Sequence, residues 1–214
     1  MKRWFRLEWI LSFFYPSLLW FKKEKEKTIY LTFDDGPVPD VTPFVLDELN
    51  RHKVKATFFC VGDNVRKFPL LFDRILEEGH TIGNHTFNHL NGWHTNSSEY
   101  FDNINKAEEI FKSSTTHDKK EDYLRLFRPP YGKISRSQIT RLKSKYTIAM
   151  WDVLTKDYDP KFPPDKCLHR SIKLTHPGSI VIFHDSIKAE KNLRAVLPSY
   201  LSHFCALGYS FRKL

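Results

Sequence analysis

Short apolar runs alternate with amphipathic stretches from Lys27 to the C-terminus, and this alternation restricts the fold more than any other feature of the chain. The apolar runs have the length and the aromatic and β-branched content of buried strands, whereas the intervening stretches have helical spacing. The predicted strands are residues 28–33, 56–62, 80–86, 123–130, 146–153, 179–185 and 209–214. The predicted helices are residues 41–52, with Asp40 as their cap, and residues 64–79, 97–113, 135–145, 164–175 and 190–207.

Alternating strands and helices predict a parallel sheet with helices outside it. About seven strands in a chain of this length favour a small or incomplete (β/α) barrel over an open sheet. In a barrel, the carboxyl ends of the strands converge on one face, where active sites form. Polar residues stand at five of those ends, and they are Asp34, Asp35, His85, Arg128, Asp152 and His184. We therefore expect these residues to lie near a common site.

Composition restricts the function less sharply. The 214 residues suffice for one substantial core, and 41% hydrophobic with 28% charged residues is ordinary for a globular protein. The formal net charge of +9 is compatible with nucleic acid, an anionic polymer or an acidic membrane surface as partner. No zinc finger, basic zipper or aromatic RNA-binding signature accompanies this charge, so we predict a solvated basic surface and no nucleic-acid partner. Three cysteines without CxxC spacing predict no disulfide framework.

Residues 1–26 form an aromatic and basic segment ahead of the predicted catalytic domain, residues 27–214. The charged start MKRWFR and the apolar run at 9–21 are reminiscent of a signal peptide, but Glu8 and Pro16 interrupt the apolar stretch and no small-residue cleavage site follows. The run is also too short to cross a bilayer. We expect the segment to pack on the domain or to lie at a membrane interface, which favours a cytoplasmic or membrane-associated location over secretion. We expect a monomer.

The two most informative polar clusters are TFDDGP at residues 32–37 and GNHTFNH at residues 83–89. Adjacent acids after a strand point in different directions, so one can bind a metal while the other faces a substrate. His85 and His89 are spaced so that both imidazoles can reach one ion, and Asp35 completes a set of two histidines and a carboxylate. Such a set leaves positions open for water and substrate, as catalytic metal sites do. The alternatives are a solvated turn for the acids and structural roles for the histidines.

Two further clusters carry candidate catalytic groups. In RPPYG (128–132), Arg128 can hold a catalytic carboxylate in its ionised form, and the backbone N–H of Tyr131 can face an oxyanion. In IFHDS (182–186), His184 ends a strongly apolar strand, and a carboxylate such as Asp157 can tune it as a general acid. A histidine that merely caps the strand is the alternative.

TFDDGP, HTFNH (85–89) and RPPY (128–131) together resemble the first three motifs of the polysaccharide deacetylase (NodB-like) family of carbohydrate esterases, and the match runs from about Lys27 to the C-terminus. The resemblance implies a distorted, incomplete (β/α) barrel. It also implies a metal-dependent hydrolase that removes N-acetyl groups from amino sugars of a peptidoglycan-like or chitin-like oligo- or polysaccharide.

The resemblance further implies a role for each matched residue. Asp34 is the expected general base, oriented by Arg128, and His184 is the acid that protonates the leaving amine. The Tyr131 amide is expected to donate to the oxyanion. The expected ligands of one divalent ion, with zinc favoured and cobalt or another ion also suitable, are Asp35, His85 and His89.

The fourth motif departs from the family pattern, which usually reads Asp-x-x-Asp-Trp. Residues 154–158 keep Asp157 but have Leu154 in place of the first acid and Tyr158 in place of the Trp. This departure leaves the tuning of His184 and the contact with the sugar open. Two alternatives to N-deacetylation also stay open: an O-acetyl esterase or other amidase with the same site, and an inactive carbohydrate-binding homologue.

Overall fold

The computed structural model describes residues 7–115 and 125–214 of the 214-residue chain. Its strands are parallel to one another in every pairing, as the alternating pattern predicts. The strands are β1 (Thr28–Asp34), β2 (Thr57–Cys60), β3 (Thr81–Asn84), β4 (Leu126–Phe127), β5 (Thr147–Ile148), β6 (Val153–Leu154), β7 (Ile180–His184) and β8 (Ser210–Arg212).

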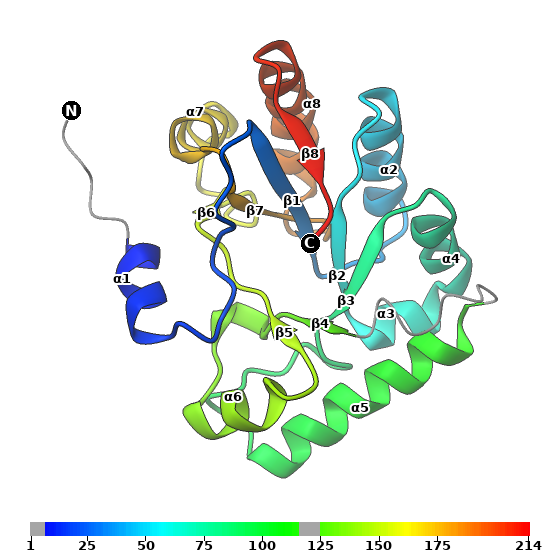
Figure 1. Cartoon of the computed structure of the whole chain (residues 1–214). Coiled ribbons are helices and arrows are strands. Elements are labelled where there is room, and N and C mark those ends of the chain that lie inside the picture. The colour runs from blue at the N-terminus through cyan, green and yellow to red at the C-terminus, as the bar shows by residue number, and fades with distance from the viewer. Residues whose placement is uncertain (1–6, 116–124) are drawn as a thin grey trace.

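The sheet has the order β5-β4-β3-β2-β1-β7-β6, and it curls into an incomplete barrel (Figure 1). β1 lies in its middle, with β7 on one side and β2 on the other, and β8 pairs with the first residues of β1. The prediction of an incomplete (β/α) barrel is therefore confirmed. Because all strands run the same way, their carboxyl ends face the same end of the barrel.

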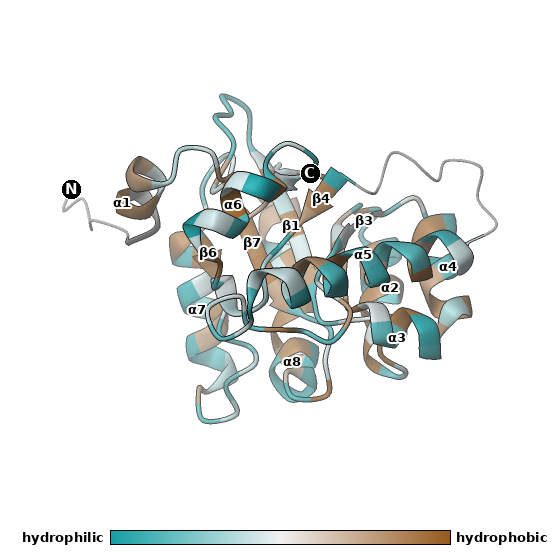
Figure 2. Cartoon of the chain, turned by 90° about the horizontal axis from the view of Figure 1, so that it is seen from below, coloured by the Kyte–Doolittle hydropathy of each residue, from teal (hydrophilic) through white to brown (hydrophobic). Residues whose placement is uncertain are grey.

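Helices lie around the outside of the curled sheet (Figure 1). In Figure 2 the hydrophobic colour gathers on the strands and on α1, whereas the outer helices show both colours, as expected for elements with one buried face. The helices are α1 (Leu7–Phe14), α2 (Val41–Arg51), α3 (Gly62–Lys67), α4 (Pro69–Glu77), α5 (Ser97–Ser113), α6 (Arg136–Leu142), α7 (Pro164–Leu174) and α8 (Glu190–Ala206), with a short 3₁₀ turn, η2 (Pro130–Gly132).

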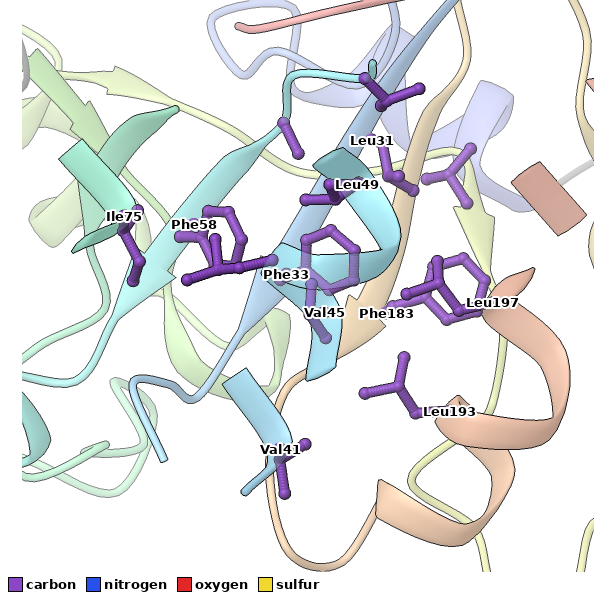
Figure 3. Packing of buried hydrophobic residues seen from close by; sticks show 14 of the residues in the cluster. Leu31, Phe33, Val41, Val45, Leu49, Phe58, Ile75, Phe183, Leu193 and Leu197 are labelled. Carbon is purple, nitrogen blue, oxygen red and sulfur yellow. The ribbon is translucent and has the colours of Figure 1, made fainter. Parts of the chain in front are cut away.

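The core lies between the central strands and the helices α2 and α8 (Figure 3). Every residue of β1 is buried, and its side chains alternate between the two faces of the sheet. Phe33 points toward the helices and stacks on Phe58 and Phe183, with ring centroids 5.1 and 6.1 Å away. Thr32 and Asp34 consequently point to the opposite face, into the barrel. A second cluster, which includes Leu18 and residues of α5 and α6, covers the β4–β5 side.

The predicted strand 146–153 is wrong in one respect: it is two strands at opposite edges of the sheet. β5 pairs with β4, whereas β6 pairs with β7. Residues 149–152 cross between these edges, and the carbonyls of Ala149 and Met150 accept hydrogen bonds from the Arg128 side chain. The first residues of the predicted strand 123–130 lie outside the described residues.

Two helix predictions are also corrected. The helix expected at 64–79 is two helices, α3 and α4, because Pro69 lacks the N–H that a continuous helix needs and instead begins α4. Asp40 occupies the N-cap position of α2, but its φ is 66° and its side chain accepts no cap hydrogen bond. Thr42 takes part in this turn instead, because its hydroxyl accepts the N–H of Val38 at 2.8 Å.

Part of the N-terminal segment is integrated into the barrel. Leu19 accepts a hydrogen bond from the N–H of Met150 at 2.7 Å and donates its own N–H to Ile148 at 2.9 Å. Phe21 then bridges to Ser179, immediately before β7. The segment thus runs from the β5 edge to the start of β7.

Helix α1 stands at the side of the molecule and exposes Ile10, Phe13 and Phe14, of which Phe13 is 80% exposed. Leu11 and Tyr15 instead pack against the second core cluster. Within residues 7–115 and 125–214, no helix has the length and apolar character required to cross a bilayer.

We predict that Phe33→Ala lowers the free energy of unfolding by about 3–5 kcal/mol, because it opens a cavity between two stacked rings at the centre of the core. Denaturant unfolding of the two proteins measures this difference. Leu207→Ala is the matched control, since Leu207 is 47% exposed and its truncation leaves stability nearly unchanged. An equal effect of both substitutions would contradict the central position of Phe33 in the core.

Candidate active site

The carboxyl ends of the strands open onto a cleft of about 710 Å³. Six of the eight predicted site residues line it, and the other two, Arg128 and Asp157, lie buried directly behind it. The residues lining the cleft are Asp34, Asp35, Val38, Asn64, His85, His89, Pro129, Tyr131, Gly132, Lys133, Trp151, Leu154, Tyr158, Ile182, His184, Ser186, Ile187 and Lys188.

One wall of the cleft holds the predicted metal ligands. Asp35 follows β1, His85 follows β3, and His89 lies in the loop after His85. Oδ1 of Asp35 lies 3.2 Å from Nε2 of His89 and 3.7 Å from Nε2 of His85. One ligand atom from each residue lies within 4.8 Å of the other two. These three atoms are therefore close enough together to bind a single ion.

Hydrogen bonds orient both imidazole rings toward this point. His85 Nδ1 lies 2.7 Å from the carbonyl oxygen of Arg128, and His89 Nδ1 lies 3.1 Å from the hydroxyl of Tyr131. A ring that donates from Nδ1 presents Nε2 as its ligand atom, which is the usual arrangement of metal-binding histidines. The donor set of two imidazoles and one carboxylate suits zinc and several other divalent ions. These residues fit a catalytic metal.

The protonation states of two of these residues also suit ligands. Burial lowers the pKa of His85 to about 4, so its imidazole is neutral at pH 7. Burial raises the pKa of Asp35, but the contact with His89 and the charge of His184 outweigh that effect and hold the pKa well below its usual range. Asp35 is therefore an ionised carboxylate.

The second acid of the pair, Asp34, is held by a buried guanidinium. Nη1 of Arg128 donates to Oδ1 of Asp34 at 2.6 Å and to the hydroxyl of Thr32 at 2.7 Å. Arg128 has no exposed surface, and its guanidinium lies 4.0 Å from the centre of the Phe59 ring. The other carboxylate oxygen of Asp34 lies 3.9 Å from Nε2 of His85, on the side of the metal ligands. One oxygen of Asp34 is thus fixed by Arg128, and the other faces the cleft.

His184 and Asp157 form a second pair across the cleft. Oδ1 of Asp157 lies 2.8 Å from Nδ1 of His184, and Oδ2 accepts the backbone N–H of His184 at 2.7 Å. The hydroxyl of Thr155 donates to the same carboxylate at 2.9 Å. Burial alone would lower the pKa of His184, but the charge and hydrogen bond of Asp157 outweigh it and raise the pKa to about 9. The imidazole is therefore protonated at neutral pH.

Tyr131 has its backbone in the left-handed region, with a φ of 61°, and its side chain is 61% exposed. Its N–H donates to no other residue in the described part of the chain. The hydroxyl contact with His89 is a role that the sequence reasoning, which considered only the amide, did not find.

Asp152, which the strand pattern also placed at the site, lies elsewhere. Its carboxylate accepts the N–H of Ile180 at 2.7 Å and the hydroxyl of Ser179 at 3.0 Å, at the amino end of β7. It also lies 2.9 Å from Nε2 of His176. Asp152 therefore anchors the crossing between β5 and β6 at the end of the barrel opposite the cleft.

Asp185 is a residue that the sequence reasoning missed. It accepts the N–H of Gly36 at 3.1 Å and the hydroxyl of Thr42 at 2.6 Å, so it holds the turn that follows Asp35. A Cβ at Gly36 would lie 2.0 Å from the Asp185 carboxylate, so only glycine fits there. The sequence signal for Asp185 is its position next to His184. Neighbouring side chains at a strand end point to opposite sides, so Asp185 is expected to point away from the side that His184 faces.

This fold and site define a class of α/β half-barrel enzymes with two histidines and a carboxylate at the strand ends. The sequence model of a family described as polysaccharide deacetylase matches residues 21–149. A peptidoglycan-N-acetylglucosamine deacetylase of Bacillus cereus is 36% identical over 184 residues, which cover 86% of this chain and 64% of that protein. A chitooligosaccharide deacetylase of Azorhizobium caulinodans is 33% identical over 165 residues, which cover 76% of this chain and 75% of that protein.

A solved structure agrees with these relatives. The crystal structure of the Bc1960 peptidoglycan N-acetylglucosamine deacetylase superposes with a TM-score of 0.86 at 31% identity and covers 99% of this chain and 95% of that one. The chain belongs to the polysaccharide deacetylase family. It spans about two thirds of the length of the Bacillus cereus relative.

We predict that Asp157→Asn lowers the pKa of His184 from about 9, because the substitution removes the negative charge that outweighs the effect of burial. NMR titration of the histidine ring protons in metal-free protein measures this shift. Asp165→Asn, at the exposed start of α7, is the charge-matched control and leaves the titration of His184 unchanged. A His184 that titrates identically in both variants would refute the role of Asp157.

Proposed function

We propose that this protein removes N-acetyl groups from amino sugars of an oligo- or polysaccharide, with a bound divalent ion, Asp34 as general base and His184 as general acid. One observation carries the proposal: an Arg-paired carboxylate and an Asp-paired, protonated imidazole line the same cleft as the His–His–Asp cluster. This arrangement supplies a proton acceptor and a proton donor beside one reacting group, which hydrolysis of an amide requires.

Asp35, His85 and His89 would hold the ion. When bound, a divalent ion supplies Lewis-acid polarisation of the acetyl carbonyl and lowers the pKa of a coordinated water. Zinc is the ion we favour, because two imidazoles and a carboxylate are typical of its catalytic sites, and cobalt or another divalent ion also suits the donors.

Asp34 would take the proton of the attacking water. Its Oδ1 is bound to Arg128, so the carboxylate is fixed in one orientation. Its Oδ2 faces the side of the metal ligands, where the attacking water must lie. The backbone N–H of Tyr131 would donate to the oxygen that becomes negatively charged as the water attacks.

His184 would complete the reaction. As the bond between the carbonyl carbon and the nitrogen breaks, the nitrogen receives the proton of the imidazolium, and the products are acetate and a free amine. An amine is a poor leaving group unless it is protonated, so an imidazole that is charged at neutral pH suits this step. This feature favours an amide over an O-acetyl ester as substrate. Asp34 keeps its partner Arg128, and His184 keeps its partner Asp157. These intact pairs favour an active enzyme over an inactive carbohydrate-binding homologue.

We predict that metal-stripped protein releases no acetate from N-acetylglucosamine oligomers and that added zinc or cobalt restores the release. His85→Ala should stay inactive after metal is added, because it removes one of three ligands. Acetate quantification together with metal analysis of each protein tests both statements. Full activity of the stripped wild-type protein would rule out the metal-dependent reaction.

We predict that Asp34→Asn lowers kcat by about 10²–10⁴-fold while the protein still binds its metal, because the amide cannot accept the water proton. Metal titration and acetate release on the same preparation separate the two effects. Asp63→Asn, at a half-buried position of α3 where the carboxylate pairs with Arg66 and Lys67, is the matched control and keeps its activity. An Asp34→Asn variant with wild-type kcat would show that another group is the base.

A further inference from the structure

Two lysines line the cleft, and the reaction proposed above uses neither of them. Lys133 follows η2 and is half-buried, whereas Lys188 lies in the loop after β7 and is exposed. Within residues 7–115 and 125–214, no carboxylate lies within 4.0 Å of either ammonium group. Both ammonium groups are therefore available to a ligand.

The acids of the cleft do not offset these charges. The carboxylates among the lining residues are Asp34 and Asp35. Asp34 forms an ion pair with Arg128, and Asp35 belongs to the metal-ligand cluster. The charge that remains for a substrate to meet is positive, in a chain whose formal net charge is already +9.

Each ammonium group lies over an aromatic ring. Lys188 Nζ lies 5.6 Å from the centre of the Tyr158 ring, and that ring lies 5.0 Å from the ring of His184. On the other side, Lys133 Nζ lies 5.4 Å from the centre of the Trp93 ring. Lys133 also follows Tyr131 closely in sequence, and the Tyr131 ring lies 4.6 Å from that of His89. Lys188 thus lies on the side of the proposed acid, His184, and Lys133 lies on the side of the predicted metal ligands.

The two lysines lie on loops that follow different strands. Lys133 is carried by the loop after β4 and Lys188 by the loop after β7, and the sheet order places β3, β2 and β1 between those strands. The two ammonium groups therefore approach the cleft from different sides of it.

We propose that Lys133 and Lys188 bind carboxylates on the sugars that flank the one being deacetylated, so that the cleft selects a carboxylate-bearing glycan over a neutral one. This inference rests on the proposed function. The relatives of the chain include both a peptidoglycan and a chitooligosaccharide deacetylase. Binding of carboxylates by these lysines favours peptidoglycan over a chitin-like oligosaccharide as the substrate. In peptidoglycan the carboxylate comes either from the lactyl group of the sugar or from a peptide attached to it.

The test compares three substrates of equal sugar number: a neutral N-acetylglucosamine tetramer, a peptide-free peptidoglycan tetrasaccharide, and the same tetrasaccharide with its peptides. The quantity measured is the ratio of kcat/KM for each anionic substrate to that for the neutral one. We expect this ratio to exceed one and to fall with added NaCl, because exposed ion pairs are screened by salt. Lys133→Gln and Lys188→Gln should each lower it by roughly two- to fivefold, and the double variant by more.

Lys112→Gln, at the exposed end of α5, is the matched control and should leave the ratio unchanged. A lowered ratio for the peptide-free substrate identifies the lactyl carboxylate, and a lowered ratio only for the peptide-bearing substrate identifies the peptide. Equal ratios in the wild-type protein and the double variant would overturn the proposal.

Binding of the same oligosaccharides to metal-loaded Asp34→Asn protein, measured by calorimetry, tests the lysines independently of turnover. Preferential, salt-sensitive binding of the anionic oligosaccharides that is lost in the lysine variants supports the proposal even if no acetate is released. Loss of acetate release with all three substrates counts against the proposed function instead. Equal affinity for the neutral and anionic oligosaccharides would overturn the assignment of the lysines.

Discussion

The buried guanidinium of Arg128 is the group on which the rest of the site depends. It is fully enclosed by the barrel, and burying such a charge is costly unless a counter-charge and hydrogen-bond acceptors surround it. Asp34 supplies the charge, and Thr32 together with the carbonyls of Ala149 and Met150 supplies the remaining acceptors. These acceptors come from β1 and from the crossing after β5, so the packing of the barrel and the position of the Asp34 carboxylate, the proposed base, depend on the same buried charge.

The same residue also links Asp34 to the predicted metal ligands. The side chain of Arg128 orients Asp34, while its carbonyl oxygen accepts the Nδ1 hydrogen of His85. On the other side of the cleft, Asp157 binds both the ring and the backbone of His184. Asp34 and Asp157 are both buried carboxylates, but Asp34 pairs with Arg128 and Asp157 pairs with His184. The guanidinium of Arg128 fixes one oxygen of Asp34, whereas Asp157 keeps a proton on His184.

Much of this arrangement could be predicted from the sequence because it depends on local patterns. Apolar runs that end in polar residues locate the strand ends, and parallel strands bring those ends together, which is why Asp35, His85 and His184 were found. Asp152 follows an equally apolar run but lies at the opposite end, because residues 149–152 cross between two edges of the sheet instead of continuing β5. That crossing is stabilised by Arg128 and Leu19, which are distant in sequence, and no local pattern reveals them. Asp185 stands next to His184 in sequence, but its role depends on Gly36 and Thr42, which lie in another part of the chain.

The structure shows what the departure of residues 154–158 from the family pattern changes in the cleft. Asp157 keeps its full set of contacts with His184, so the change at Leu154 does not remove the carboxylate that tunes the imidazole. Tyr158 keeps an aromatic ring edge-on to His184, as a Trp at that position could. Leu154 lines the cleft, where a carboxylate would add a negative charge opposing that of Lys133 and Lys188. With an apolar side chain at this position the contacts of Asp157 with His184 are kept and the cleft is more positive, as the proposed selection of a carboxylate-bearing glycan requires.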